Sequence, residues 1–142
     1  MAQIDLNYAL LDHTADLGIR TWGAHLKKLF ENAGMALMDV LIRGVSPKRA
    51  LPKNISLTGE DLSDLMVRWL GEILYLLNGE TRVVTSIRVV NIRPTGLDAV
   101  LETVPFDPEL HEILVEIKAV TYHQIEVSEK GNRWEAQVIF DL

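Results

Sequence analysis

The sequence predicts an α+β fold in which two long helices pack against one mixed or antiparallel sheet. Residues 24–42 and 62–77 carry apolar residues at spacings of three and four, which is typical of amphipathic helices. The other segments are short, rich in β-branched residues and bounded by glycine or proline, which indicates strands. With 142 residues, 48% of them hydrophobic, the chain is long enough for one domain, residues 1–142, with a substantial core.

The first half of the chain contains both predicted helices, preceded by strands at residues 8–11 and 17–22. Gly34 inside the first helix costs about 1 kcal/mol relative to alanine, so it is expected where the helix closely approaches the sheet. Gly44 is predicted to end this helix. The second helix begins after residues 58–61, which supply capping groups and acids suited to the positive end of the helix dipole.

The second half is predicted to be mostly β-structure. Residues 94–96 form a turn between two strands that should pair in antiparallel fashion, and residues 129–132 form a second hairpin turn. Alternation between residues 111 and 121 predicts one strand in which Lys118 projects from the face opposite the main apolar set. The predicted strands after the first helix are residues 54–57, 83–93, 97–104, 111–121, 124–128 and 133–140.

The composition excludes several classes of function. The chain has no cysteine, which rules out disulfides, thiolate zinc sites and cysteine nucleophiles. Its net charge is −6 and its pI is near 5.1, which disfavours a surface for direct binding of nucleic acid. Residues 1–5 resemble neither a signal peptide nor a membrane-spanning helix, so a soluble, cytoplasmic protein that does not bind membranes is expected.

Two predicted strands end in the same way, with an apolar residue followed by aspartate. Leu11 leads into Asp12, and Phe140 leads into Asp141. If the first and last strands are neighbours, both carboxylates meet at one edge of the sheet. Carboxylates are hard oxygen ligands that suit Ca²⁺ or Mg²⁺, and Leu142 could add a main-chain oxygen. The alternative is that each aspartate only forms a turn after its strand.

The other polar candidates have structural alternatives. His13 could act as a ligand or a base, but a histidine at a turn is more often a structural group, and Asp16 is expected to bond local backbone amides. Residues 118–123 offer a cation, a hydroxyl, a phenol and an imidazole, which would suffice for acid–base chemistry, or they form the polar face of an ordinary strand. The sequence contains no glycine-rich phosphate loop, serine elbow or paired-histidine metal motif, so an autonomous enzyme is poorly supported.

Taken together, segments along almost the whole chain resemble the archease family. Each segment is unspecific alone, but their combination is highly specific. They are Asp12–Ile19, Trp22–Gly23, Leu29–Ala33, Gly59 with Asp61 and Leu62, Trp69–Leu70, Leu74–Leu76, His111, Ile117–His123 and Phe140–Leu142.

The resemblance implies a two-layer α+β sandwich and an accessory role. Archeases assist the RtcB-type tRNA-splicing ligase, a metal- and GTP-dependent enzyme that seals RNA ends. They promote guanylylation of the ligase histidine and multiple turnover, and are not themselves the ligase. By this resemblance a divalent cation, Ca²⁺ or Mg²⁺, is held by Asp12, Asp141 and the carbonyl of Leu142, and Lys118 matches a functionally implicated lysine. His13 and Asp16 are then expected to position the turn around the cation.

The sequence departs from the family pattern at two places. Many members carry a Gly-Glu pair shortly before the motif histidine, whereas this chain has Thr-Val-Pro-Phe-Asp at residues 103–107, so no role is assigned to that acid. Leu142 replaces the commoner isoleucine, which leaves a main-chain ligand unaffected.

Two other functions stay open. One is a chaperone-like protein-binding module that modulates RNA-modifying enzymes such as tRNA methyltransferases, with the acids only stabilising the fold. The other is a free-standing metal hydrolase, which is disfavoured because two carboxylates and a main-chain carbonyl include no obvious base.

Overall fold

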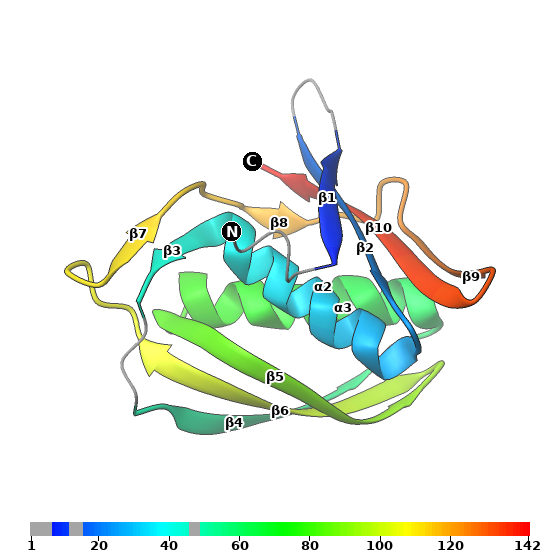
Figure 1. Ribbon diagram of the computed structural model, residues 1–142, viewed down its shortest axis with the longest axis horizontal. Coiled ribbons are helices and arrows are strands. Elements are labelled where there is room, and N and C mark those ends of the chain that lie inside the picture. The colour runs from blue at the N-terminus through cyan, green and yellow to red at the C-terminus, as the bar shows by residue number, and fades with distance from the viewer. Residues whose placement is uncertain (1–6, 12–15, 46–48) are drawn as a thin grey trace.

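The computed structural model describes residues 7–11, 16–45 and 49–142. Within these residues two helices lie between two larger sheets (Figure 1). In chain order the elements are β1 (Tyr8–Leu11), β2 (Leu17–Gly23), α2 (Leu26–Leu41), β3 (Ile42–Gly44), β4 (Leu51–Thr58), α3 (Leu62–Asn78), β5 (Arg82–Arg93), β6 (Gly96–Pro105), β7 (His111–Ile113), β8 (Ala119–Val120), β9 (Glu126–Lys130) and β10 (Arg133–Asp141).

The described strands pair only in antiparallel fashion and form three sheets. One sheet has the order β1-β2-β10-β8, with β9 also on β10, the second has the order β4-β6-β5, and β3 pairs with β7 alone. The predicted α+β class, with two long helices and largely antiparallel strands, is confirmed. The expectation of a single sheet is wrong, since the strands are divided among three sheets. Each helix packs between two of them: α2 contacts β2 and β5, and α3 contacts β8 and β5.

The two helices are apolar over more than one face, which explains why sheets cover them from two sides. Trp69 of α3 is fully buried, and its indole N–H donates to the Phe30 carbonyl of α2 at 2.8 Å. Gly34 is also buried, and an added Cβ would meet side chains of Ile87 in β5 and Ile73 in α3, so the predicted close approach is confirmed. Neither helix in the described part of the chain is long and apolar enough to cross a membrane.

The predicted boundaries are confirmed for α3 and corrected for α2. Asp61 caps α3 by accepting a hydrogen bond from the Asp64 N–H at 2.8 Å. The first helix ends at Leu41, and Gly44 belongs to β3 instead of ending the helix. The φ of Gly44 is +145°, and an added Cβ would fall on the Leu110 backbone carbonyl, so this glycine is required by the contact with the chain that leads into β7.

Two predicted strands have different lengths in the structure. The strand predicted at 54–57 extends over Leu51–Thr58 and includes Pro52, which is tolerated because β4 lies at the edge of its sheet. The single strand predicted over 111–121 is instead β7 and β8, separated by residues 114–118. Because β7 pairs with β3 and β8 pairs with β10, the chain crosses between two sheets here and cannot continue as one strand.

Candidate functional site

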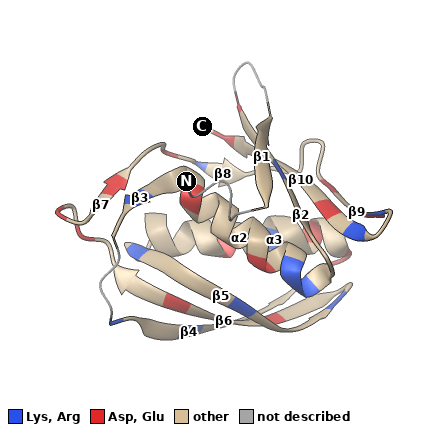
Figure 2. Cartoon of the chain, viewed as in Figure 1, with Lys and Arg blue, Asp and Glu red and all other residues tan. Residues whose placement is uncertain are grey.

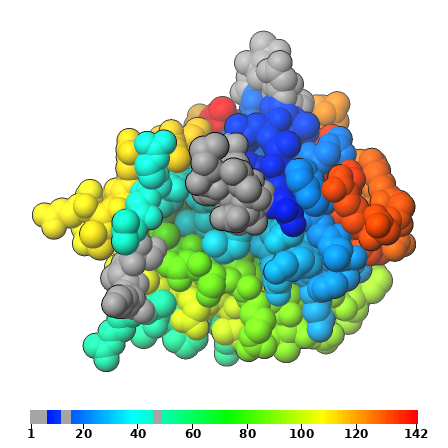
Figure 3. Space-filling model, in the orientation of Figure 1, coloured from blue at the N-terminus to red at the C-terminus, as the bar shows by residue number. Residues whose placement is uncertain are grey.

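The C-terminal end of β10 lies at an exposed edge of the five-stranded sheet. Asp141 is the last residue of the strand, and its side chain is exposed, as is Leu142, which is 41% accessible. The C-terminal residues reach the surface on the same side of the molecule as β1 (Figure 3). The preceding residue, Phe140, is fully buried and pairs with Leu17 on one side and Val120 on the other. Strand pairing on both sides therefore fixes the position of Asp141.

Lys118 lies directly beside Asp141. The backbone N–H of Lys118 donates to the Asp141 carbonyl at 2.8 Å, and the following residue, Ala119, pairs with Asp141. Ile117 on the other side is buried, and its carbonyl accepts a hydrogen bond from the Asn78 side chain of α3 at 3.0 Å. The Lys118 side chain is exposed and makes no ion pair with any described residue. Its ammonium is therefore available to an external anion.

The end of β1 lies at the same edge, although the expectation that the first and last strands are neighbours is wrong. β2 lies between β1 and β10 and pairs with both. Since both pairings are antiparallel, β1 and β10 run in the same direction. Leu11 pairs with Gly18, and Gly18 pairs with Ile139. Two strand spacings separate Leu11 from Ile139, which is about 10 Å. β1 and β10 both end toward the same side of the molecule (Figure 1).

The site residues predicted from the sequence are therefore only partly visible. Asp12 and His13 lie outside the described residues. Asp16 is half-buried immediately before β2, and its side chain forms no hydrogen bond with the described part of the chain. Leu11, Lys118, Asp141 and Leu142 are described at one edge, which we call the Asp141 edge.

The described residues alone do not make a complete metal site. No group of three or more His, Cys, Asp or Glu side chains among them could hold a metal ion. The Asp141 carboxylate and the main-chain oxygen of Leu142 are hard donors of the kind that Ca²⁺ and Mg²⁺ prefer, but two donors are fewer than either ion takes. A cation at this edge would need Asp12, the residue that follows Leu11, or solvent.

Thr121 and Tyr122 use their side chains within the fold, whereas the exposed His123 imidazole makes no hydrogen bond with a described residue. The Thr121 hydroxyl donates to the Ile139 carbonyl at 2.9 Å. The Tyr122 hydroxyl donates to the Asp64 carboxylate at 2.6 Å, and this bond raises the pKa of Tyr122. The same bond, with the backbone N–H of Glu60, holds the pKa of Asp64 below its usual value. The Thr121 and Tyr122 hydroxyls therefore position the segment that follows Lys118.

Asp64 and Arg68 of α3 also contribute to holding this segment, which was not predicted from the sequence. The Arg68 guanidinium bonds the second oxygen of Asp64 at 2.9 Å, one helical turn away. The spacing of four residues on a helix predicts this ion pair. Nothing in the sequence pairs Asp64 with Tyr122, which is 58 residues away.

The surface charge is mixed in this part of the molecule. Lys and Arg residues are interspersed with Asp and Glu along the described elements and do not gather in one basic stripe in the view of Figure 2. The net charge of −6 agrees with that distribution.

The sequence profile of the archease protein family (MTH1598/TM1083) matches residues 8–142. The chain belongs to the archease family. The resemblance noted in the sequence is thereby confirmed over nearly the whole chain.

Individual archeases are similar in sequence and in structure. An archease from Methanosarcina acetivorans is 37% identical over 139 residues, covering 95% of each chain. One from Pyrococcus furiosus is 36% identical over 135 residues, covering 92% of this chain and 95% of that one. The solution structure of Methanobacterium thermoautotrophicum protein 1598 has a TM-score of 0.69 at 27% identity and covers 96% of this chain and 99% of its own.

A crystal structure from Thermotoga maritima, described as an archease and possible chaperone, has a TM-score of 0.63 at 20% identity. It covers 93% of this chain and 94% of its own. At that identity the likeness concerns the fold alone, and it agrees with the mixed α+β architecture described above.

Proposed function

We propose that this archease is an accessory activator of an RtcB-type RNA ligase and that the Asp141 edge is the surface that acts on the ligase. The observation that carries the proposal is the 2.8 Å hydrogen bond from the Lys118 N–H to the Asp141 carbonyl. This backbone bond holds Lys118, whose ammonium has no ion pair among the described residues, next to the strand end that carries the exposed Asp141. A reaction that transfers a guanylyl group needs positive charge to balance its phosphates.

In the proposed arrangement a divalent cation, Ca²⁺ or Mg²⁺, is held by the carboxylates of Asp12 and Asp141 and by the main-chain oxygen of Leu142. The common edge shared by Leu11 and Ile139 supports this grouping, since Asp12 follows Leu11 in the chain. Such a cation supplies charge that neutralises phosphate oxygens. The role of the chain is to hold that charge, with the Lys118 ammonium beside it, on a rigid strand end.

The activity test measures guanylylation of an RtcB-type ligase with and without the archease. Asp12→Ala, Asp141→Ala and Lys118→Ala should each abolish most of the stimulation, and the parent protein should convert single turnover into multiple turnover. Glu129→Ala is the matched control, because Glu129 is an exposed acid in β9, paired with the opposite end of β10. Full stimulation by Asp12→Ala and Asp141→Ala would reject the cation.

Cation binding is tested separately by calorimetric titration of the isolated protein with CaCl₂ or MgCl₂. Asp12→Asn and Asp141→Asn should each remove the heat of binding, whereas Glu129→Gln should leave it unchanged. If the parent protein binds neither cation but still stimulates the ligase, the accessory role stands and the assignment of Asp12, Asp141 and Leu142 as cation ligands is wrong.

A chaperone-like protein-binding module, acting on RNA-modifying enzymes such as tRNA methyltransferases, is the second candidate. Exposed apolar side chains at or beside the Asp141 edge favour it: Leu10 is 52% accessible and Leu142 is 41% accessible. This function predicts that the protein suppresses aggregation of unrelated proteins without added cation, and that Asp141→Ala does so as well as the parent. Failure to suppress aggregation would remove this candidate.

A further inference from the structure

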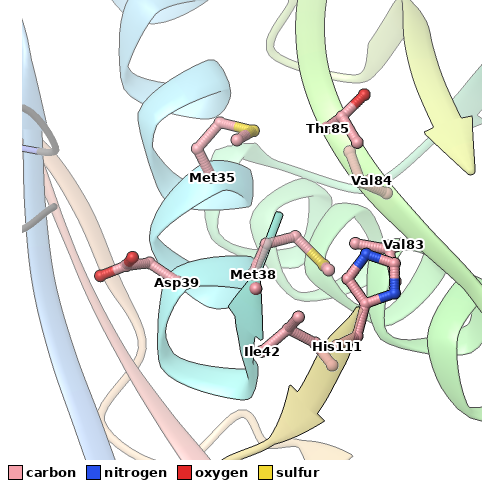
Figure 4. A pocket seen from close by; sticks show the side chains of 9 residues that line it. Met35, Met38, Asp39, Ile42, Val83, Val84, Thr85 and His111 are labelled. Carbon is pink, nitrogen blue, oxygen red and sulfur yellow. The ribbon is translucent and has the colours of Figure 1, made fainter. Parts of the chain in front are cut away.

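Two hollows in the described surface differ in the groups that they offer to a partner. The hollow in Figure 4, of about 260 Å³ between α2, β3, β5 and β7, has mostly apolar walls. The Nε2 of His111, which has no hydrogen-bond partner among the described residues, is enclosed there by protein atoms. The other hollow, of about 360 Å³, lies between α3 and β8, and Lys118 is part of its wall. An accessible charged group distinguishes this second hollow, which we call the α3-β8 hollow.

The α3-β8 hollow is bounded by two hydrogen bonds between α3 and the segment beside it. The Asn78 side chain, at the C-terminal end of α3, donates to the Ile117 carbonyl at 3.0 Å. The Tyr122 hydroxyl donates to Asp64, in the first turn of α3, at 2.6 Å. Gly71 lies between these two points of attachment, and a Cβ added to it would meet nothing within 4 Å. The space opposite Gly71 is therefore open and not filled by side chains.

The wall of the α3-β8 hollow is mostly apolar and includes one charged side chain. Lys118 is exposed and makes no ion pair with a described residue. The ring of Tyr75 is 56% exposed at the same hollow, so an aromatic surface and a positive charge are both open to a partner. The other lining residues are Val67, Gly71, Leu74, Asn78, Ala119 and Val120.

The charges around the α3-β8 hollow indicate where an acidic group of a partner would lie. Lys118 also lines a smaller hollow of about 210 Å³, but the Glu116 carboxylate is part of that wall. On the β4 side of Gly71, Glu72 lines the surface together with Arg68, which is already in an ion pair. Because like charges repel, Glu116 and Glu72 disfavour an acid at these two neighbouring places. The position that complements a carboxylate is therefore in the α3-β8 hollow, next to Lys118.

We propose that the α3-β8 hollow docks a segment of the ligase in which a large apolar side chain lies next to an aspartate or glutamate, an inference that rests on the proposed function. The apolar side chain would occupy the space opposite Gly71, and the carboxylate would pair with Lys118. The volume is ample for one side chain, since whole small-molecule ligands occupy pockets of about 300–1,000 Å³. Apolar anchors in a pocket, with tyrosine and charged groups around them, are typical of protein interfaces.

The position of the hollow connects docking to the Asp141 edge. Ala119 lines the hollow and pairs with Asp141, so a segment docked there would bring the ligase against the proposed cation site. The ammonium of Lys118 has three N–H donors and can bond a carboxylate of the ligase and a phosphate oxygen at the same time. Docking and charge balance are therefore compatible roles of this lysine.

The test measures the affinity of the full chain for an RtcB-type ligase by calorimetric titration. Gly71→Leu fills the hollow from α3 and should weaken binding about tenfold or more, as expected when an interface anchor is blocked. The variant should fold, because the added side chain enters open space and leucine favours a helix more than glycine does. Lys27→Leu, at an exposed position of α2 that does not line this hollow, is the matched control and should bind as the parent does.

Variants of Lys118 test the pairing with a carboxylate. Lys118→Glu reverses the charge and should weaken binding about tenfold or more, because like charges across an interface repel. Lys118→Arg keeps the charge and should retain most of the affinity, whereas Lys27→Glu should leave the affinity unchanged. Binding of Lys118→Glu as tight as that of the parent would overturn the pairing with an acid of the ligase.

Binding and guanylylation measured on the same samples distinguish docking from activation. If the parent stimulates the ligase and Gly71→Leu binds it as tightly as the parent does, docking in the hollow is wrong and activation stands. If Gly71→Leu weakens binding but the parent does not stimulate, activation is wrong and docking stands. If the parent does not bind the ligase, both are wrong. A parent dimer that Gly71→Leu converts to a monomer, seen by light scattering, would assign the hollow to a second copy of the chain and overturn the proposal.

Discussion

The β4-β6-β5 sheet and the Asp141 edge are built in opposite ways. In the sheet, β4 pairs with β6 residue by residue from Leu51 to Thr58, and β5 pairs along nearly all of β6. At the edge, β8 consists of two residues, and the chain before it is held by single bonds from Asn78 and to Asp141. The sheet is supported by repetition, whereas the edge depends on a few specific contacts that place exposed side chains.

This difference separates stability from function. A residue buried in the regular sheet contributes to the free energy of unfolding through packing. A residue of the edge contributes little to it, because Asp141 and Lys118 are exposed. Local, weakly supported segments are also where binding surfaces are commonly found. Four substitutions test this difference between the sheet and the edge.

Leu101→Ala should have the largest effect on stability. Leu101 is fully buried in β6, so its truncation leaves a cavity and should lower the free energy of unfolding by about 2–5 kcal/mol. Asp141→Ala, at the exposed edge, should change it by less than about 0.5 kcal/mol. Urea unfolding of both variants measures the contrast, and comparable losses would contradict the division between sheet and edge.

Gly44→Ala should have the next largest effect. The left-handed φ of +145° and the Leu110 carbonyl leave no space for a Cβ, so strain should cost about 1–3 kcal/mol and loosen β3 from β7. Gly71→Ala is the control with opposite sign: its Cβ meets nothing within 4 Å, and alanine should stabilise α3 by up to about 1 kcal/mol. Thermal unfolding measures both, and equal effects would refute the contact argument.

Asn78→Ala removes the bond to the Ile117 carbonyl and should cost about 1 kcal/mol. The substitution should change the amide hydrogen exchange rate at Lys118 more clearly than the free energy of unfolding. Exchange should become faster, because the segment before β8 loses one of its hydrogen bonds. Asn91→Ala, at an exposed position of β5, should leave that exchange rate unchanged. Unaltered exchange in Asn78→Ala would mean that the bond to Asp141 alone holds Lys118.

Asp64→Asn should have the smallest effect and is best seen in the titration of Tyr122. The Asp64 carboxylate raises the pKa of Tyr122, so the neutral amide should bring that pKa back toward about 10. The raised pKa means that the stability from this bond is present at neutral pH and is lost as the pH rises through the titration of Tyr122 in the folded protein. Because the pKa of Asp64 is lowered, the same contact is also lost as the pH falls through the titration of Asp64 in the folded protein.

Phenolate absorbance as a function of pH measures this change, and Tyr122→Phe identifies the contribution of Tyr122. A Tyr122 titration identical in the parent and in Asp64→Asn would contradict the assigned cause.

The sequence predicted the regular elements well because periodicity reports which residues are buried. Both helices and the β5-β6 pair were predicted nearly to their ends. The failure at residues 111–121 has a physical origin: β7 pairs with β3 and β8 pairs with β10, so this segment crosses from one sheet to another. Alternation in a sequence indicates burial on one side and does not identify the sheet that provides it.

For the candidate site, sequence spacing predicted which strand ends carry acids but not how the strands are ordered. The intervening β2 could not be inferred from Leu11 and Phe140, since pairing partners far apart in the sequence leave no local signal. The bond between Tyr122 and Asp64 was missed for the same reason. The pairing of Asp12 with Asp141 came from the two strand ends and was repeated by the family resemblance, the functional role of Lys118 came from the resemblance, and all these roles stay predictions.

The pairing of β2 with β10 also bears on how the protein is made. The hydrogen bond from Arg20 to Gln137 joins residues 117 positions apart, and both helices and the β4-β6-β5 sheet lie between them in the chain. During translation β2 leaves the ribosome long before its partner exists, so contacts of this range form late. A nascent chain can complete its helices and its regular sheet while the Asp141 edge is still missing, so an assembled edge marks a chain that has been translated through β10.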